Sequence, residues 1–150
     1  MSERFIPAGD DRSIAIYCYN RAQDLYHSIR TTEQDQEMLE MALTSKTHWQ
    51  LVGGPQEFAM SDWMVSRVYV LLKDPALAIE YALGSLVHDQ EGFPTWLKAS
   101  VFEGVARAHK YARNDSEFLR FRGLAVDALS LETDLEDKKF IMQQIQELSN

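Results

Sequence analysis

Residues 66–74 read SRVYVLLKD, and residues 106–114, which follow at a spacing of 40, read ARAHKYARN. Each stretch begins with a small residue, an arginine, a small or branched apolar residue and a ring side chain. Each ends in a basic residue followed by Asp or Asn, a combination that suits the end of one helix and the cap of the next. The match predicts a helical unit that is repeated every 40 residues.

Small residues recur at the same spacing elsewhere in the chain. Ala42 and Ala82 are one repeat apart, and so are Ser45 and Ser85. Small side chains at equivalent positions let neighbouring helices approach closely, and stacked helix pairs can cover each other's apolar faces. We therefore expect three helix pairs that stack side by side, with a last helix over the open end. An irregular helical bundle is the alternative.

Apolar residues at spacings of three and four, with no sustained alternation of period two, predict an all-α protein of about seven antiparallel helices. Breaks at Gly53-Gly54-Pro55 and Asp74-Pro75, and a loop over 89–94, separate several of them. The expected helices cover approximately residues 11–30, 31–52, 55–72, 75–88, 94–112, 114–131 and 133–150. Residues 1–150 form one domain in this interpretation, with a loose lead-in at 1–10 and a capping helix at 133–150.

Capping patterns mark several of these helix starts. Asp10 or Asp11 is expected to cap the first helix. Thr31 with Gln34, Asn114 with Glu117 and Thr133 with Glu136 have the spacing of a capping box, in which two side chains satisfy free backbone N–H groups.

Charge and composition exclude several classes of function. The chain has 15 basic and 23 acidic residues, and its net charge of -8 opposes general binding to nucleic acids or anionic membranes. No apolar run approaches the roughly 20 residues that span a bilayer, and the first residues lack the apolar core of a secretion signal. Cys18 is the single cysteine, so no disulfide can form within the chain, and we expect this residue to be buried. A cytoplasmic location is the expectation.

One part of the chain resembles the tetratricopeptide repeat family. The resemblance rests on Val65-Ser66 and Tyr69 in one helix and on Ala78, Tyr81, Ser85 and Leu86 in the next, which are similar to the family's pattern of large, small and aromatic residues. It covers roughly residues 20–130. The chain departs from the family in its spacing, which exceeds the usual 34 or so residues, in Ala82 where a ring is common, and in Phe118 where alanine is expected.

The stretch that contains Ser45, His48-Trp49, Val52-Gly53, Trp63 and residues 66–69 more closely resembles a group of uncharacterised bacterial helical proteins built on this repeat. That group has no assigned activity. The two resemblances imply an α–α superhelix and leave the function open.

The tetratricopeptide resemblance also implies a binding groove lined by the first helix of each pair, with a peptide or a helix of a partner protein as the ligand. The positions carried over to this chain are Trp63, Arg67, Glu103, Arg107, Lys110 and, by a weaker register, Gln23, His27 and Arg30. A carboxylate of the partner is expected to bind to Arg67, Arg107 and Lys110, because guanidinium and ammonium groups form charge-assisted hydrogen bonds. Trp63 is the expected apolar anchor.

Structural roles for the same residues are the alternative. Arg67 and Arg107 can lie over apolar helices and pair with acidic residues, and Trp63 and Trp96 can serve packing. His48 can interact with the last carbonyls of its helix. If the arginines serve binding alone, substituting both Arg67 and Arg107 by Glu is expected to abolish partner binding and to leave the melting temperature nearly unchanged.

Two other functions remain open at this point. The first is a small helical enzyme whose pocket contains His48, His109 and Glu103. The second is a self-associating structural protein, in which Leu135, Ile141, Ile145 and Leu148 form a homodimer seam. No cofactor or metal is predicted, because the four histidines lack the spacing of a metal-binding motif and no glycine-rich phosphate loop is present.

Overall fold

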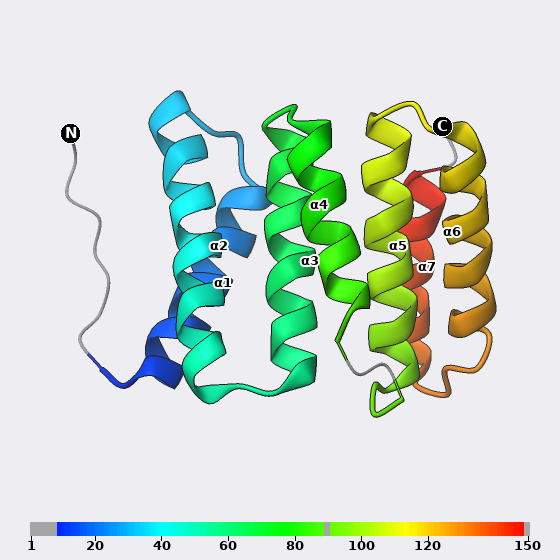
Figure 1. The fold of residues 1–150 in the computed structure, drawn as a ribbon, viewed down its shortest axis with the longest axis horizontal. Helices are drawn as coiled ribbons and strands as arrows, with labels where there is room; N and C mark the ends of the chain where they lie inside the picture. Colours follow the sequence, from blue (N-terminus) through cyan, green and yellow to red (C-terminus); the bar gives the residue numbers. More distant parts are fainter. Residues whose placement is uncertain (1–8, 89–90, 149–150) are drawn as a thin grey trace.

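The computed structural model describes residues 9–88 and 91–148, and within these ranges the chain forms seven α-helices and no strand, as the sequence predicts. The helices are α1 (Asp11–Tyr26), α2 (Thr32–Val52), α3 (Pro55–Leu71), α4 (Pro75–Leu86), α5 (Thr95–Tyr111), α6 (Asp115–Leu129) and α7 (Leu135–Glu147) (Figure 1). Most of the expected lead-in at 1–10 lies outside the described residues.

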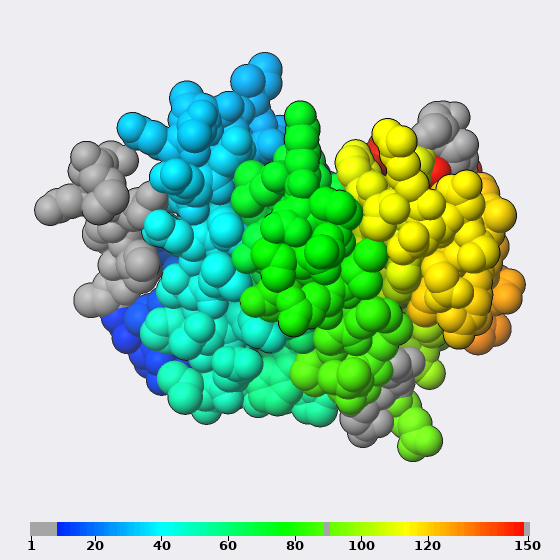
Figure 2. All heavy atoms as spheres, turned by 45° about the horizontal axis from the view of Figure 1, so that its top comes forward, coloured from blue at the N-terminus to red at the C-terminus, as the bar shows by residue number. Residues whose placement is uncertain are grey.

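Successive helices pack as hairpins. α1 packs against α2, α3 against α4 and α5 against α6, and contacts between α2 and α3 and between α4 and α5 join the hairpins. α7 lies against α5 and α6, and in Figure 1 it passes behind α5 as α1 passes behind α2. In Figure 2, α2, α4 and α6 form most of the surface that faces the reader, and α7 is almost entirely hidden. Helices α1 and α7 therefore belong to the opposite side of the molecule.

Small residues lie in the seams between the helices. Ala42, Ser45, Ala82 and Ser85 are each 1% exposed, which confirms the expectation of close approach at these repeated positions. The Ser45 hydroxyl donates to the carbonyl oxygen of Ala15 at 2.7 Å, so a hydrogen bond reinforces the contact between α1 and α2.

Two turns at the repeat spacing have the same backbone. Lys73 and Arg113 are both in the left-handed region, with φ of 63° and 62°. The backbone N–H of the residue that follows, Asp74 or Asn114, donates to the carbonyl five positions earlier, at 3.0 Å and 2.9 Å. Each turn ends the first helix of a hairpin and starts the second, so the match between residues 66–74 and 106–114 corresponds to a shared local structure.

Three predicted caps are confirmed. Asp10 accepts a hydrogen bond from the backbone N–H of Ser13, and it is therefore the cap of α1. Thr31 and Gln34 form the full capping box at the start of α2. Asp74 caps α4 by accepting from the third backbone N–H after it.

Two predicted capping boxes are wrong. Asn114 precedes α6, but its side chain does not cap the helix; its amide instead contacts Nδ1 of His109 at 3.1 Å. α7 is capped by Asp134, which accepts from the backbone N–H of Asp137 at 2.9 Å, one position later than the predicted Thr133. At α6, the side chain of Asn114 bonds to the buried ring of His109 and is therefore not available to cap the helix backbone.

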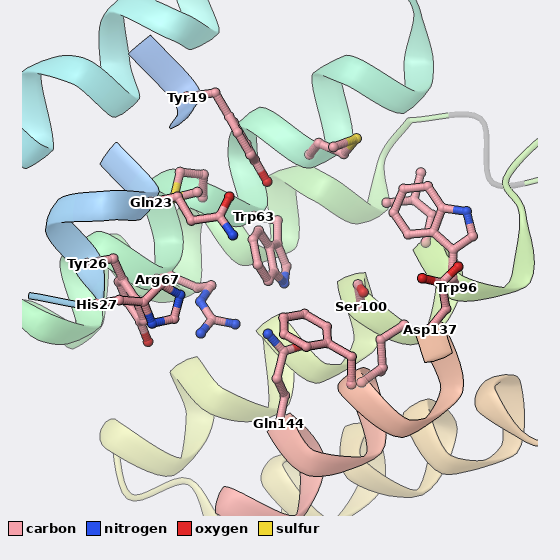
Figure 3. A pocket seen from close by; sticks show the side chains of 15 residues that line it. Tyr19, Gln23, Tyr26, His27, Trp63, Arg67, Trp96, Ser100, Asp137 and Gln144 are labelled. Atoms are coloured by element: carbon pink, nitrogen blue, oxygen red, sulfur yellow. The ribbon is translucent and has the colours of Figure 1, made fainter. Parts of the chain in front are cut away.

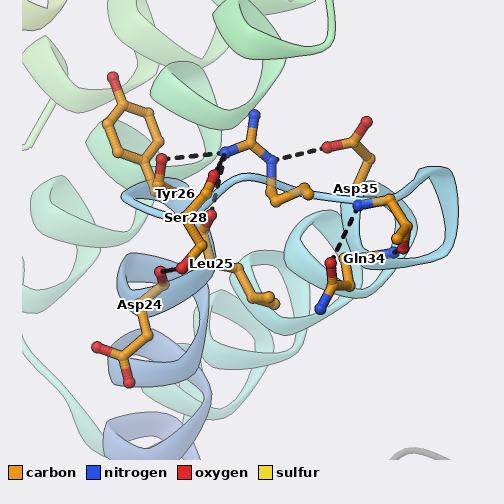
Figure 4. A network of polar contacts seen from close by, with 8 residues as sticks. Asp24, Leu25, Tyr26, Ser28, Gln34 and Asp35 are labelled. Atoms are coloured by element: carbon orange, nitrogen blue, oxygen red, sulfur yellow. Dashed lines mark hydrogen bonds and ion pairs between the residues drawn. The ribbon is translucent and has the colours of Figure 1, made fainter.

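The first helix is also shorter than predicted, because the side chain of Arg30, which lies beyond its end, bonds to its last carbonyl groups. α1 stops at Tyr26, and the Arg30 Nη1 group donates to the carbonyl oxygens of Leu25, Tyr26 and Ser28 at 3.0, 3.1 and 2.8 Å (Figure 4). Its Nε donates to Asp35 Oδ1 at 2.7 Å. The side chain thus satisfies carbonyls that have no partner in the helix.

The apolar seam of α7 is largely used within the chain. Ile141, Ile145 and Leu148 are buried against α5 and α6, while Leu135 is 80% exposed. In the described part of the chain, we find no helix with both the length and the apolar character needed to traverse a bilayer.

Candidate functional site

A cavity of about 220 Å³ lies between α1, α3, α5 and α7 (Figure 3). All four helices contribute side chains to its wall. Aromatic residues dominate one part, where Tyr26 and Trp63 flank the guanidinium group of Arg67, and Trp96 lies at the other end beside Asp137. The cavity therefore has a cationic end at Arg67, and its other end combines the Trp96 ring with the Asp137 carboxylate.

Arg67 is held by two aromatic rings. Its guanidinium carbon is 4.5 Å from the ring centroid of Trp63 and 4.6 Å from that of Tyr26. Figure 3 shows the group between the two side chains. Such cation–π contacts stabilise the positive charge and do not use the N–H groups of the guanidinium as hydrogen-bond donors to oxygen.

Glu103 lies beneath this end of the cavity and is shared by two arginines. Its side chain is fully buried, and Oε1 accepts hydrogen bonds from Nη2 and Nε of Arg107 at 2.6 and 3.1 Å. Nη1 of Arg67 is 3.7 Å from the same oxygen. Burial, the largest single influence, lowers the pKa of Arg107, but the charge and hydrogen bonds of Glu103 together with the nearby Tyr26 and Glu147 outweigh it, and the pKa is raised. Arg107 therefore interacts more strongly with the Glu103 carboxylate than Arg67 does.

Three buried polar atoms at this place lack a hydrogen-bond partner among the described residues: Arg67 Nη1, Trp63 Nε1 and Glu103 Oε2. Arg67 is only 5% exposed. A buried donor without an acceptor costs roughly 1–3 kcal/mol, so such atoms are rare in folded proteins and call for a ligand or water. Two of the three atoms, on Arg67 and Trp63, are donors on residues that line the cavity.

Gly104 makes room for the indole of Trp63. A Cβ atom at this position of α5 would lie 2.8 Å from Trp63 Cδ1 and 3.3 Å from its Nε1. Only a residue without a side chain lets the ring lie this close to the helix. No sequence pattern marks Gly104, because the contact joins residues of two different helices that are 41 positions apart in the chain.

Further hydrogen-bonding groups face the cavity. Burial raises the pKa of Tyr19 to about 12, although the nearby charge of Arg67 acts in the opposite direction. The Tyr19 hydroxyl is therefore protonated at neutral pH and can donate. Ser100 and Gln144 also line the cavity and are 9% and 8% exposed. In Figure 3 the Gln144 amide lies near Arg67.

The structure brings together four of the predicted groove residues. The cavity is lined by Gln23, His27, Trp63 and Arg67, and Glu103 lies under it in contact with Arg67. Arg30 does not line the cavity, since its side chain is bonded to the end of α1. The wall of the cavity also includes Asp137 and Gln144 of α7, the helix that the sequence predicts only as a cap at 133–150.

Arg107 and Lys110 line a second hollow, of about 370 Å³, near the end of α7. Nζ of Lys110 donates to the carbonyl oxygen of Leu148 at 2.6 Å, and Nη2 of Arg107 is 3.9 Å from Glu147. The predicted groove residues of the third hairpin thus face a different opening from Trp63 and Arg67, and Glu103 connects the two.

The residues of the enzyme alternative do not meet. His48 pairs with Asp11 at 2.7 Å. His109 stacks on a phenylalanine of α6 and accepts from Asn114, and burial lowers its pKa. Neither histidine lines the cavity in the part of the chain that the structure describes.

Comparison of the chain with models of protein families, with curated proteins and with solved structures finds no match.

Proposed function

We propose that the protein is a non-enzymatic interaction module that binds a peptide segment of a partner protein on the side formed by α1, α3, α5 and α7. In this proposal a carboxylate of the peptide pairs with Arg67, and an adjacent large apolar side chain enters the cavity towards Trp96. The observation that carries the proposal is the pair of buried donors without an acceptor, Arg67 Nη1 and Trp63 Nε1.

A carboxylate matches the chemistry of these donors. Two aromatic rings flank the Arg67 guanidinium, so an acceptor has to approach from a side that the rings leave open. A carboxylate offers two coplanar oxygens, which suits a guanidinium group and a neighbouring indole N–H. The Tyr19 hydroxyl, which is protonated at neutral pH, is a further donor in the wall of the cavity.

The size of the cavity supports a single anchoring side chain. About 220 Å³ accommodates one large apolar residue, and the remainder of a bound segment would lie outside it. Buried aromatic pockets of this kind are where peptide complexes concentrate their affinity. The cavity is lined by the first helix of each hairpin, α1, α3 and α5, and this supports a tetratricopeptide-like arrangement as part of the proposal.

The proposal is tested by selection from a random peptide library displayed on phage. Wild-type protein is expected to enrich peptides in which an acidic group adjoins an aromatic or large aliphatic residue. An Arg67→Met variant keeps a long side chain between the two rings but has no charge, so it is expected to lose the enrichment for acid. Arg120→Met is the matched control, because Arg120 is 61% exposed and pairs with Glu117 on α6.

Two outcomes would count against the proposal. One is that wild-type protein enriches no common acidic pattern. The other is that Arg67→Met and wild type select the same peptides, which would mean that water or a neutral group satisfies the donors. Sedimentation of the wild-type protein alone tests the homodimer alternative separately.

A cytoplasmic location, and partners other than nucleic acids and membranes, belong to the same proposal. The net charge of -8 supports the second point, and the single buried cysteine, Cys18, supports the first.

A further inference from the structure

The ionic groups at the cationic end of the cavity carry one excess positive charge. Arg67 and Arg107 are 5% and 7% exposed, and the carboxylate between them is fully buried. Glu147 lies 3.9 Å from Arg107 but is 57% exposed on its side chain, so solvent screens it. Two buried guanidinium groups therefore share one buried carboxylate.

The excess charge resides mainly on Arg67. Arg107 donates two hydrogen bonds to Glu103 Oε1, whereas Arg67 Nη1 is 3.7 Å from that oxygen and makes no hydrogen bond. A single negative charge at Arg67 would neutralise the group of three. A second negative charge would remain uncompensated in a buried place, where the attraction and repulsion of charges are strong.

We infer that Glu103 sets the charge selectivity of the cavity, so that the site binds an acid with one negative charge, a carboxylate, and discriminates against a dianion such as a phosphate monoester. Glu103 Oε1 lies within 3.7 Å of the donor that the ligand uses, and Oε2 is a buried acceptor without a partner. Any anionic oxygen bound to Arg67 therefore comes within about 7 Å of the Glu103 carboxylate. This inference rests on the proposed function, because it concerns the same cavity.

The test uses two probes that differ in the charge of their acidic group. Phenylacetate carries one negative charge, and phenyl phosphate carries two at a pH of about 8, since its second pKa is near 6. Binding is followed by the NMR signal of the Trp63 indole N–H, which is identified by its loss in Trp63→Phe. Dissociation constants in the millimolar range or below are expected for probes of this size.

Wild-type protein is expected to bind phenylacetate about tenfold more tightly than phenyl phosphate. In Glu103→Gln, which keeps the shape of the side chain and an acceptor for Arg107, most of this preference should disappear. Glu147→Gln is the matched control, because it removes the exposed carboxylate beside Arg107, and its preference should equal that of wild type. If Glu103 only supported the fold, the Glu103→Gln substitution would weaken the binding of both probes equally.

If Glu103→Gln does not fold, Arg107→Met provides the second test. Without Arg107, the Glu103 carboxylate is free to neutralise Arg67, and binding of phenylacetate should weaken about tenfold although residue 107 does not line the cavity. Unchanged binding in this variant would overturn the inference. So would a wild-type protein that binds phenyl phosphate as well as phenylacetate, or one whose Trp63 signal responds to neither probe. Selection of acidic peptides that depends on Arg67 would in each case leave the proposed function standing.

Discussion

At the scale of single residues, the site depends on contacts that only the folded chain reveals. The sequence resemblance identified Trp63 and Arg67, because both lie in the best-matching stretch. It placed Glu103 in the groove as well, whereas the structure buries it beneath Arg67 as a shared counter-ion. Gly104 gave no signal, since a glycine inside a helix has no pattern that indicates which ring will lie against it.

Gly104→Ala is predicted to disturb the cavity. Replacing glycine by alanine inside a helix normally stabilises a protein by roughly 0.5–1 kcal/mol. Here the new Cβ would lie 2.8 Å from Trp63 Cδ1, so the indole has to move. We expect no gain in the free energy of unfolding, a shifted Trp63 indole N–H signal and weaker binding of phenylacetate.

Gly123→Ala is the control for this variant. Gly123 is also inside a helix, and an added Cβ would meet nothing within 4 Å. It should therefore show the normal gain in urea unfolding and an unchanged Trp63 signal. Equal stabilisation by the two substitutions would show that Trp63 accommodates the methyl group.

At the scale of helices, the sequence predicted all seven elements, and local signals explain why. Thr31 with Gln34, and Asp74 with Pro75, are capping signals that act within a few residues, so they can be recognised without the rest of the fold. The errors arise where a distant group intervenes. α1 ends four residues before the predicted position, where the side chain of Arg30 bonds to its carbonyl groups. The side chain of Asn114 bonds to His109 instead of capping α6.

Lys73→Gly is predicted to stabilise the hairpin of α3 and α4. Lys73 has a φ of 63°, a conformation that costs an L-residue roughly 1–2 kcal/mol and a glycine almost nothing. Part of this is offset by the greater freedom of glycine in the unfolded chain, so we expect a gain of about 0.5–1 kcal/mol in urea unfolding. Lys73→Ala, which removes the same side chain but keeps a Cβ, should show no such gain. A similar effect of both substitutions would mean that the lysine side chain, not the backbone, determines the difference.

At the scale of the whole molecule, the buried charges change one expectation from the sequence. If the arginines served binding alone, substituting both Arg67 and Arg107 by Glu would leave the melting temperature nearly unchanged. In the structure both lie against the fully buried Glu103. The double variant would place three carboxylates together without a counter-ion, a situation that costs several kcal/mol.

We therefore predict that Arg67→Glu combined with Arg107→Glu lowers the melting temperature strongly or prevents folding, as measured by circular dichroism. Arg120→Glu, at an exposed position, should change it little. Arg67→Met should also have a small effect, because Arg107 still neutralises Glu103. A double variant that melts like wild type would show that Glu103 becomes protonated or solvated at little cost.

The contribution of α7 to the cavity could not be predicted from the sequence. Its apolar seam was recognised, but the choice between a cap and a dimer interface depends on what lies opposite, which no local pattern encodes. Once Ile141 and Ile145 are buried against α5 and α6, the geometry of the helix directs Asp137 and Gln144 to the cavity. Their role follows from the packing of the whole chain.

The residues that line the cavity come from helices along the whole chain, from α1 near its start to α7 near its end. When α1 leaves the ribosome, the residues that complete the binding side have not yet been translated. A nascent chain that ends before residue 137 lacks Asp137 and Gln144, and with them the wall of the cavity that α7 forms. In the proposed function, a partner is therefore expected to find a complete cavity only after α7 has been translated.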